Sequence, residues 1–365
     1  MVILMHWLSA CGLVSVLALS FSAIRLSGID SGTRTENPVY LADRALGGVT
    51  IRILALGDVN LGRGVGQEIL AGDTLYPFVA VMDSFASYDV VFANLESQLS
   101  DQDGETQHPR NNLIFTGPPA GASTLRKAGI TVVSTANNHA IDYGIKALRE
   151  TNRYLKEAGV HFVGTSEDSR RLFEPVIISR KGIRVAFFGC TDVMNIENPM
   201  WKEYVAEADT ARLFPVMRAV RDSVDFMVVS YHGGEEYAER PAQRTRDFAR
   251  QVISGGADLF LGHHPHVPYG VEELDGKYIV HSLGNFVFRQ PDRFWTQRSF
   301  AFEATILKDV AGVRVSFFRC LPVRAGFQPS FITEQSEIDL ILERIRTLSS
   351  QSLTQQITWQ NSVYW

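Results

Sequence analysis

Three of the nine histidines fall within five consecutive residues, Gly262-His263-His264-Pro265-His266. Imidazole is the commonest metal ligand near neutral pH. His264 and His266 form an H-x-H pair. On a turn, such a pair can present both rings to one ion or one ring to each of two neighbouring ions. This spacing indicates a metal site.

Other side chains that can ligate metals follow short apolar runs that are typical of strands. One such placement is unremarkable, because an Asp can cap a helix and an Asn often stands in a turn. In open α/β folds, however, the carboxyl ends of strands converge on one crevice. Six runs end in this way, which predicts a shared site: Asp58 follows VTIRILALG, Asn94 and Glu96 follow DVVFA, Asn138 and His139 follow ITVVSTA, His232 follows DFMVVSY, His264 and His266 follow DLFLG, and Asn285 follows YIVHSLG.

The donor set is mixed nitrogen and oxygen without thiolate. Such a set suits Zn, Mn, Fe or Ni rather than a structural sulfur site. A carboxylate, here Glu96, is the type of group that bridges two ions. We therefore expect divalent ions, two in number. We assign no metal role to His108 or His161, which are expected at the surface or as satisfied core residues.

The elements that would position these residues alternate along the chain. From about Val49, a β-rich apolar run is followed by a polar turn and then by a helical stretch, which predicts an α/β domain. We expect helices from Gly144 to Ala158, capped by Gly159, and from Arg240 to Ser254, ending at Gly255-Gly256. The runs PVIISRKGIRVAFFG and FAFEATIL-KDVA-GVRVSFF read as hairpins and add antiparallel pairs.

Composition limits the classes of function. The 365 residues are 45% hydrophobic, and the formal net charge of −5 argues against nucleic acid as a partner, which would require a basic face. The three cysteines, Cys11, Cys190 and Cys320, show no CxxC spacing, so we expect buried free thiols rather than a cysteine zinc site.

The N-terminus is apolar from Trp7 to Ile24, and about 18 such residues can cross a bilayer core. A buried core helix is the weaker alternative, because amphipathic periodicity is absent. We expect a membrane contact through this segment and an extracytoplasmic location. The predicted organisation is a signal peptide or membrane anchor at 1–28, a linker at 29–48, the main domain at 49–330, and a C-terminal helical extension and tail at 331–365.

An ordered set of motifs resembles the CapA family of poly-γ-glutamate capsule synthesis proteins, which looks like a branch of the calcineurin-like metallophosphatases. The resemblance runs from about Ile51 to Phe288, and the set is far more specific than any one motif. The motifs are GDVNLGR from Gly57, NLE from Asn94, ANNHAIDYG from Ala136, HGGEEY from His232, GHHPHV from Gly262 and SLGNF from Ser282.

The resemblance implies an α/β/β/α fold, in which two facing sheets are flanked by helices. It also implies roles for individual residues. His139 would assist the leaving group, and Arg63 and Asn285 would line the substrate pocket. The implied metal-binding positions are Asp58, Glu96, Asn138, His232, His264 and His266. The chain departs from the metallophosphatase pattern at Asn60, where that pattern has a His, and at Glu96, where it has an Asp.

Two hypotheses about function follow from the residues and the resemblance. The first is a metal-dependent hydrolase acting on an anionic polymer or a phosphoester. The family implies a role in synthesis, release or anchoring of the γ-glutamyl capsule polymer, with membrane-bound capsule synthesis proteins as partners. The second is a non-catalytic, membrane-tethered accessory protein for export or assembly of that polymer.

Overall fold

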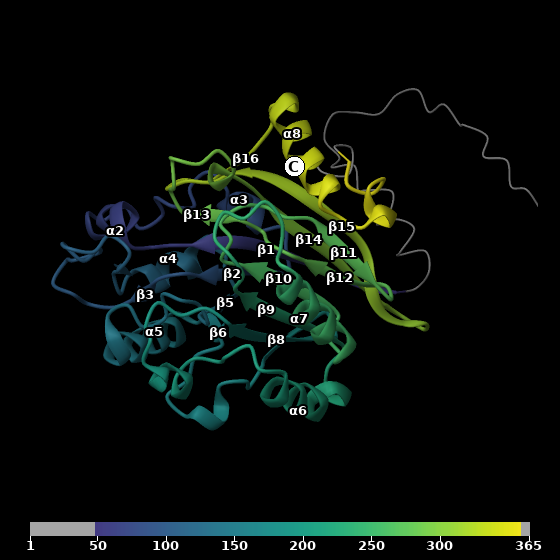
Figure 1. Ribbon diagram of the computed structural model, residues 1–365, viewed down its shortest axis with the longest axis horizontal. Coiled ribbons are helices and arrows are strands. Elements are labelled where there is room, and N and C mark those ends of the chain that lie inside the picture. Colours follow the sequence, from purple (N-terminus) through teal and green to yellow (C-terminus); the bar gives the residue numbers. More distant parts are fainter. Residues whose placement is uncertain (1–47, 359–365) are drawn as a thin grey trace, which may run out of the picture.

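A computed structural model describes residues 48–358. Two large β-sheets face each other in this part of the chain (Figure 1). The eight-stranded sheet has the order β16-β15-β14-β1-β2-β5-β6, with β13 also paired to β1. Its strands are β1 (Val49–Val59), β2 (Val90–Leu95), β5 (Val132–Ser134), β6 (His161–Val163), β13 (Asn285–Val287), β14 (Arg298–Asp309), β15 (Gly312–Arg324) and β16 (Ser330–Phe331).

The second large sheet has six strands in the order β11-β12-β10-β9-β8-β7. A short pair, β3 (Gln98–Leu99) and β4 (Thr116–Gly117), lies outside both large sheets. The six strands are β7 (Val176–Arg180), β8 (Ile183–Thr191), β9 (Phe226–His232), β10 (Leu259–His263), β11 (Val271–Leu274) and β12 (Lys277–Val280).

The strand β1 shows why the sheets are covered on both faces. Ile51 and Ile53 belong to the core between the two sheets, whereas Leu54 and Leu56 belong to the core on the outer side of the eight-stranded sheet. Successive side chains of a strand point to opposite faces, so a strand that is apolar on both faces must be buried on both. The near-continuous apolar run of this segment therefore requires a helical layer outside the sheet.

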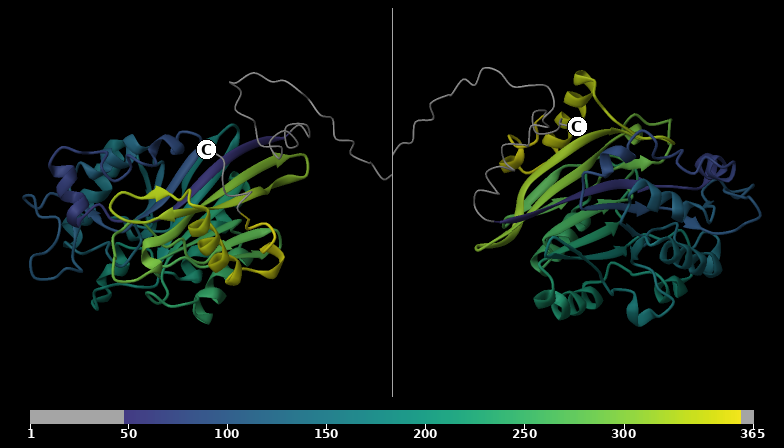
Figure 2. Two further views of the ribbon diagram at one scale, coloured as in Figure 1. Left: turned by 90° about the horizontal axis from the view of Figure 1, so that it is seen from above. Right: turned by 180° about the vertical axis from the view of Figure 1, so that it is seen from behind.

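Helices supply that outer layer on both sides (Figure 2). The helices α2 (Arg63–Leu70), α3 (Met82–Phe85), α4 (Gly121–Ala128) and α5 (Gly144–Ala158) pack on the eight-stranded sheet, whereas α6 (Thr210–Val220) and α7 (Gln243–Ser254) pack on the six-stranded sheet. The helix α8 (Gln335–Thr347) inserts Ile338, Ile341 and Ile345 into the core between the sheets. The predicted α/β/β/α class is confirmed.

The local predictions were correct to different degrees. The helix α5 has the predicted bounds, and Gly159 caps it in the left-handed conformation, with φ of +73°. Both predicted hairpins form, as β7 with β8 and as β14 with β15. The predicted start of α7 at Arg240 was wrong. A residue before proline disfavours the helical region, and the helix begins at Gln243, after Pro241 and the extended N-cap Ala242.

The strands that carry the candidate site residues run parallel in both sheets. In the first sheet β1 pairs in parallel with β2, and β2 with β5; in the second β9 pairs in parallel with β8 and β10. Their carboxyl ends therefore open toward the same end of the sandwich.

No helix within residues 48–358 is long and apolar enough to cross a bilayer. The predicted signal or anchor at 1–28, Cys11, and the 29–48 linker apart from Gly48 lie outside the described residues. Cys190 and Cys320 are buried free thiols, as expected.

A buried ion cluster joins three strands of the eight-stranded sheet. The Glu303 carboxylate on β14 accepts hydrogen bonds from Arg52 on β1, from Arg319 on β15 and from the Tyr88 hydroxyl. Burial raises the pKa of Glu303, but the two guanidinium groups outweigh burial and hold this pKa below its usual value. The cluster therefore stabilises the protein at neutral pH. That contribution is lost as the pH falls below the unfolded-state pKa of about 4.3 and through the folded one.

We predict that Glu303→Gln lowers the free energy of unfolding by about 3–5 kcal/mol at pH 7, because it leaves the buried Arg319 and the partly buried Arg52 without their carboxylate. Urea unfolding measures this change. The control is Glu343→Gln, which breaks the exposed i,i+3 pair with Arg346 and is expected to cost less than about 1 kcal/mol. Equal losses in the two variants would refute a stabilising role for the cluster.

Candidate metal centre

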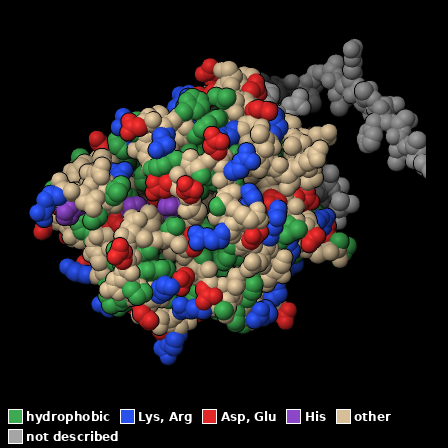
Figure 3. Space-filling model, viewed as in Figure 1, with side chains coloured by type: hydrophobic (Ala, Val, Ile, Leu, Met, Phe, Trp, Pro, Cys, Tyr) green, Lys and Arg blue, Asp and Glu red, His purple; other side chains and the backbone are tan. Residues whose placement is uncertain are grey.

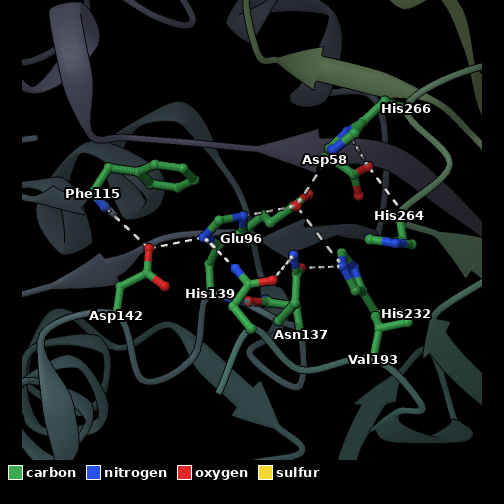
Figure 4. A network of polar contacts seen from close by, with 12 residues as sticks. Asp58, Glu96, Phe115, Asn137, His139, Asp142, Val193, His232, His264 and His266 are labelled. Atoms are coloured by element: carbon green, nitrogen blue, oxygen red, sulfur yellow. Dashed lines mark hydrogen bonds and ion pairs between the residues drawn. The ribbon is translucent and has the colours of Figure 1, made fainter. Parts of the chain in front are cut away.

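The predicted ligands meet where the carboxyl ends of the parallel strands open (Figure 4). Asp58 lies near the end of β1, Glu96 directly follows β2, and His232 is the last residue of β9. His264 and His266 follow β10 on one loop. All five side chains are buried, with at most 6% of each residue exposed. The fold thus brings together residues that are far apart in sequence.

Glu96 lies at the middle of this group. Its Oε1 is 3.8 Å from Nε2 of His232, 3.7 Å from Nε2 of His266 and 3.8 Å from Nε2 of His139. Neither carboxylate oxygen has a hydrogen-bond partner in the described part of the chain. Burial raises the pKa of Glu96 well above its usual value, and the charges of Asp58 and Glu236 raise it further. Because an unpaired buried carboxylate is costly, this position favours a cation.

Two donor groups share Glu96. The first is Glu96, His232 and His264, and the second is Asp58, Glu96 and His266; the ligand atoms of each group lie within 4.8 Å of one another. Nδ1 of His264 is also buried without a hydrogen-bond partner among the described residues. This arrangement fits divalent cations beside the carboxylate that the two groups share, and the number of ions stays a prediction. Metal binding by the individual residues stays a prediction.

Burial favours the neutral form of two of these imidazoles, His232 and His264. Burial lowers the pKa of His232 well below its usual value, and the neighbouring His264 lowers it further. Burial, followed by the charge of His266, lowers the pKa of His264 to about 4. Burial raises the pKa of Asp58, but the imidazoles of His263 and His266 outweigh burial and hold it well below its ordinary value. At pH 7 these shifts favour neutral imidazoles at His232 and His264 and an ionised carboxylate at Asp58, the protonation states that metal ligation requires.

Asn138 and His139 lie side by side in the turn after β5 but point to different partners. Nε2 of His232 donates to Oδ1 of Asn138 at 2.7 Å, so Asn138 faces the His232 group. His139 instead packs on Phe115, with ring centroids 4.2 Å apart. Its Nδ1 lies 2.8 Å from Oδ2 of Asp142.

Asp142 fixes the orientation of His139. Its Oδ2 accepts the Nδ1 proton of His139 and the backbone N–H of Phe115, so Nε2 of His139 points toward Glu96. From the sequence, Asp142 was recognised only as part of the ANNHAIDYG motif, without a role of its own. The i,i+3 spacing of His139 and Asp142 on one turn is the signal that could have identified this pair.

Arg63 and Asn285 border the ligand group in different ways. The guanidinium of Arg63 lies 4.4 Å from the Phe115 ring centroid and donates from Nη2 to the carbonyl of Asn112. Asn285 lies behind His266, where its Oδ1 accepts the Nδ1 proton at 2.8 Å. That bond leaves the Nε2 lone pair of His266 facing Glu96. Orientation of a ligating histidine by such a partner is common in metal sites.

Three further residues shape the surroundings of Asp58. Its Oδ1 accepts a hydrogen bond from Nδ2 of Asn94 at 2.9 Å and lies 3.3 Å from Nδ1 of His263. Its Oδ2 lies 3.4 Å from Nδ1 of His266. Asn60 turns back on its own loop, where its Oδ1 accepts the N–H of Gly62 at 2.7 Å. Asn60 therefore offers no ligand atom to the group of Asp58, Glu96 and His266.

Backbone strain concentrates at the site. Seven non-glycine residues in the described chain have positive φ, and four of them border the ligand group: Arg63, Tyr237, His264 and His266. Each such conformation costs roughly 1–3 kcal/mol and persists only where the surrounding structure imposes it. Strain at the loops that present the ligands is typical of a functional site.

Figure 3 shows histidine side chains beside acidic ones on the face viewed in Figure 1.

Comparison with known proteins gives matches at the level of sequence and of fold. The family model of the bacterial capsule synthesis protein PGA_cap matches residues 52–290. Capsule biosynthesis protein CapA of Bacillus anthracis is 30% identical over 249 residues, which cover 66% of this chain and 60% of that protein. PGA biosynthesis protein CapA of Bacillus subtilis is 30% identical over 247 residues, covering 66% and 63%. The chain thus spans about three fifths of the length of these relatives.

Among solved structures, the calcineurin-like phosphoesterase YfkN from Bacillus subtilis is similar with a TM-score of 0.47 and 13% identity. That similarity covers 82% of this chain and 97% of the other.

Proposed function

The chain belongs to the bacterial capsule synthesis protein family PGA_cap, and from this premise we propose that it is an extracytoplasmic, metal-dependent hydrolase. Its substrate would be an anionic γ-glutamyl polymer or a phosphoester, and its role the synthesis, release or anchoring of the poly-γ-glutamate capsule. The apolar segment from Trp7 to Ile24 supports a membrane contact and an extracytoplasmic location. Membrane-bound capsule synthesis proteins are the partners that fit this role.

The observation that carries the proposal is the unpaired carboxylate of Glu96 amid the imidazoles of His232, His266 and His139. A buried carboxylate without hydrogen bonds is costly to keep in a fold. With divalent cations beside it, the Glu96 carboxylate would serve as a ligand to both donor groups.

Divalent ions held there would activate water and stabilise the charge that develops on the oxygens of a phosphoryl or acyl centre. The chain supplies the remaining groups. His139 would donate the proton on Nε2 to the departing oxygen or nitrogen, with Asp142 holding the Nδ1 proton. Arg63 would bind an anionic group of the substrate beside the Phe115 ring.

An activity assay on the purified full-length protein tests the proposal. The protein would be loaded separately with Mn, Zn, Fe or Ni and assayed on phosphomonoesters, phosphodiesters and γ-glutamyl amides. We expect turnover of an ester or of a γ-glutamyl amide that disappears with chelator and returns with metal. Protein that retains bound metal but turns over none of these substrates would contradict the proposal.

One observation favours the second candidate, a membrane-tethered accessory protein without catalysis. Asn60 hydrogen-bonds within its own loop, so the Asp58, Glu96 and His266 group has three donors. A weakly held second ion would suit a structural role better than hydrolysis. The same assay separates the candidates, because an accessory protein would bind metal and capsule polymer without turnover.

A further inference from the structure

None of the predicted metal ligands lies on β8, but the loop that follows this strand reaches the candidate metal centre. Thr191, the last residue of β8, pairs in parallel with His232, the last residue of β9. The backbone N–H of Asp192 donates to the carbonyl of His232 at 3.2 Å. The loop after β8 therefore leaves the sheet beside a predicted ligand, at the edge where the carboxyl ends of parallel strands converge.

Apolar contacts anchor the same loop against the turn that carries Asn138. Trp201, farther along the loop, is buried in a small cluster with Ala136, which lies at the start of that turn. Met194 packs on this cluster from the first part of the loop. Asn195 directly follows Met194 in the chain. Packing on both sides of Asn195 therefore sets its position relative to the turn, although its own side chain is exposed.

The side-chain amides of Asn195 and Asn138 are hydrogen-bonded to each other. Nδ2 of Asn138 donates to Oδ1 of Asn195 at 3.1 Å, while Oδ1 of Asn138 lies 2.7 Å from Nε2 of His232. Asn138 is only 4% exposed, so its amide N–H groups need an acceptor from the protein. Only the oxygen of an amide ligates metal ions, and the acceptor at the nitrogen decides which end of the amide faces the site. Asn195 supplies that acceptor.

Asn195 also lies near His139, but this second contact is the weaker one. Nδ2 of Asn195 is 3.4 Å from Nδ1 of His139, whereas Oδ2 of Asp142 is 2.8 Å from the same nitrogen. The shorter, charge-assisted bond to Asp142 takes the Nδ1 proton, and a protonated ring nitrogen cannot accept from an amide. Asn195 therefore acts on Asn138 rather than on His139.

We propose that Asn195 is a positioning residue of the metal centre, which holds the Asn138 amide with its oxygen toward the group of Glu96, His232 and His264. Without Asn195, the amide could turn its nitrogen toward the cations and offer them no ligand atom. Loss of a partner that orients a metal ligand typically weakens metal binding about 10–100-fold. This inference rests on the metal centre of the proposed function and holds whether or not that centre catalyses hydrolysis.

Titration of the full-length protein with Mn²⁺, followed by the electron paramagnetic resonance signal of the free ion, tests the inference without requiring turnover. Mn²⁺ is the probe because it suits oxygen ligands such as an amide carbonyl. We expect Asn195→Ala to weaken Mn²⁺ binding about 10–100-fold. Asn195→Asp keeps an acceptor for Nδ2 of Asn138 and should recover most of the affinity. The matched control is Asn198→Ala, which removes an amide of the same loop that accepts from the backbone N–H of Met200 and should leave binding unchanged.

A double-mutant cycle with Asn138→Ala completes the test. If Asn195 acts through Asn138, Asn195→Ala should cause no further loss of affinity once residue 138 is alanine. Equal affinity in wild type and Asn195→Ala, an undiminished loss in the Asn138→Ala background, or no recovery in Asn195→Asp would each overturn the inference. Wild-type protein that binds no Mn²⁺ would overturn it together with the metal centre. The expected affinity differences without turnover of any substrate would instead remove the hydrolase proposal alone.

Discussion

Glu96→Ala is expected to abolish binding of both metal ions in one step, because Glu96 is the ligand that the two donor groups share. Metal-dependent turnover should fall at least about a thousandfold, since metals contribute several kcal/mol to stabilising a transition state. Elemental analysis of the purified variant, beside an assay on the best substrate, measures both effects.

Two controls separate metal loss from other causes. His264→Ala removes a donor from one group only and should leave the Asp58 group able to bind, whereas His108→Ala should retain the full metal content. Metal-free Glu96→Gln should unfold with a free energy at least as large as that of metal-free wild type, because a neutral amide is no more costly to bury than a carboxylate without hydrogen bonds. Full metal content in Glu96→Ala would show that Glu96 is not the shared ligand.

His139→Ala is expected to keep the metals and to lose activity selectively. Nε2 of His139 faces Glu96, and Asp142 holds its Nδ1 proton, which is the geometry of a general acid. A general acid contributes about 10²–10⁴-fold, and most where the leaving group is poor. Turnover of substrates with alkyl leaving groups should fall by that factor, whereas an activated aryl leaving group, which departs without a proton, should be affected far less.

Asp142→Asn is the companion variant. It removes the carboxylate that orients His139 without removing the imidazole, so it should give a smaller loss with the same dependence on leaving group. Equal losses on both substrates with metals retained would exclude the acid role of His139. Loss of metal in His139→Ala would make His139 a ligand or a support of the ligands.

The parts of the fold that local pattern determines could be predicted from the sequence. The helix α5 follows from its amphipathic pattern and from Gly159, which adopts the left-handed conformation at its end. The strand β13 could not be predicted, because its three residues form a strand only through pairing with β1 at Asp58. The strand β16 has two residues and depends in the same way on β15.

The candidate site, like the fold, has one part that the sequence predicts and one part that it does not. Residues at strand ends could be predicted as ligands because parallel strands converge whatever their exact pairing. The groups that orient those ligands could not, since their roles depend on contacts between distant segments, such as that of His263 with Asp58. Asn285 was expected to line the substrate pocket, and the structure places it against His266. That position follows only from the contact between Asn285 and His266 in the folded chain.

The most direct test of the two-ion site is the metal content of purified full-length protein, measured by elemental analysis after exposure to Mn, Zn, Fe and Ni and removal of free metal. The expected result is two divalent ions per chain, with Glu96 between them. Protein that binds no divalent ion under these conditions, or that binds ions equally well without Glu96, would contradict it.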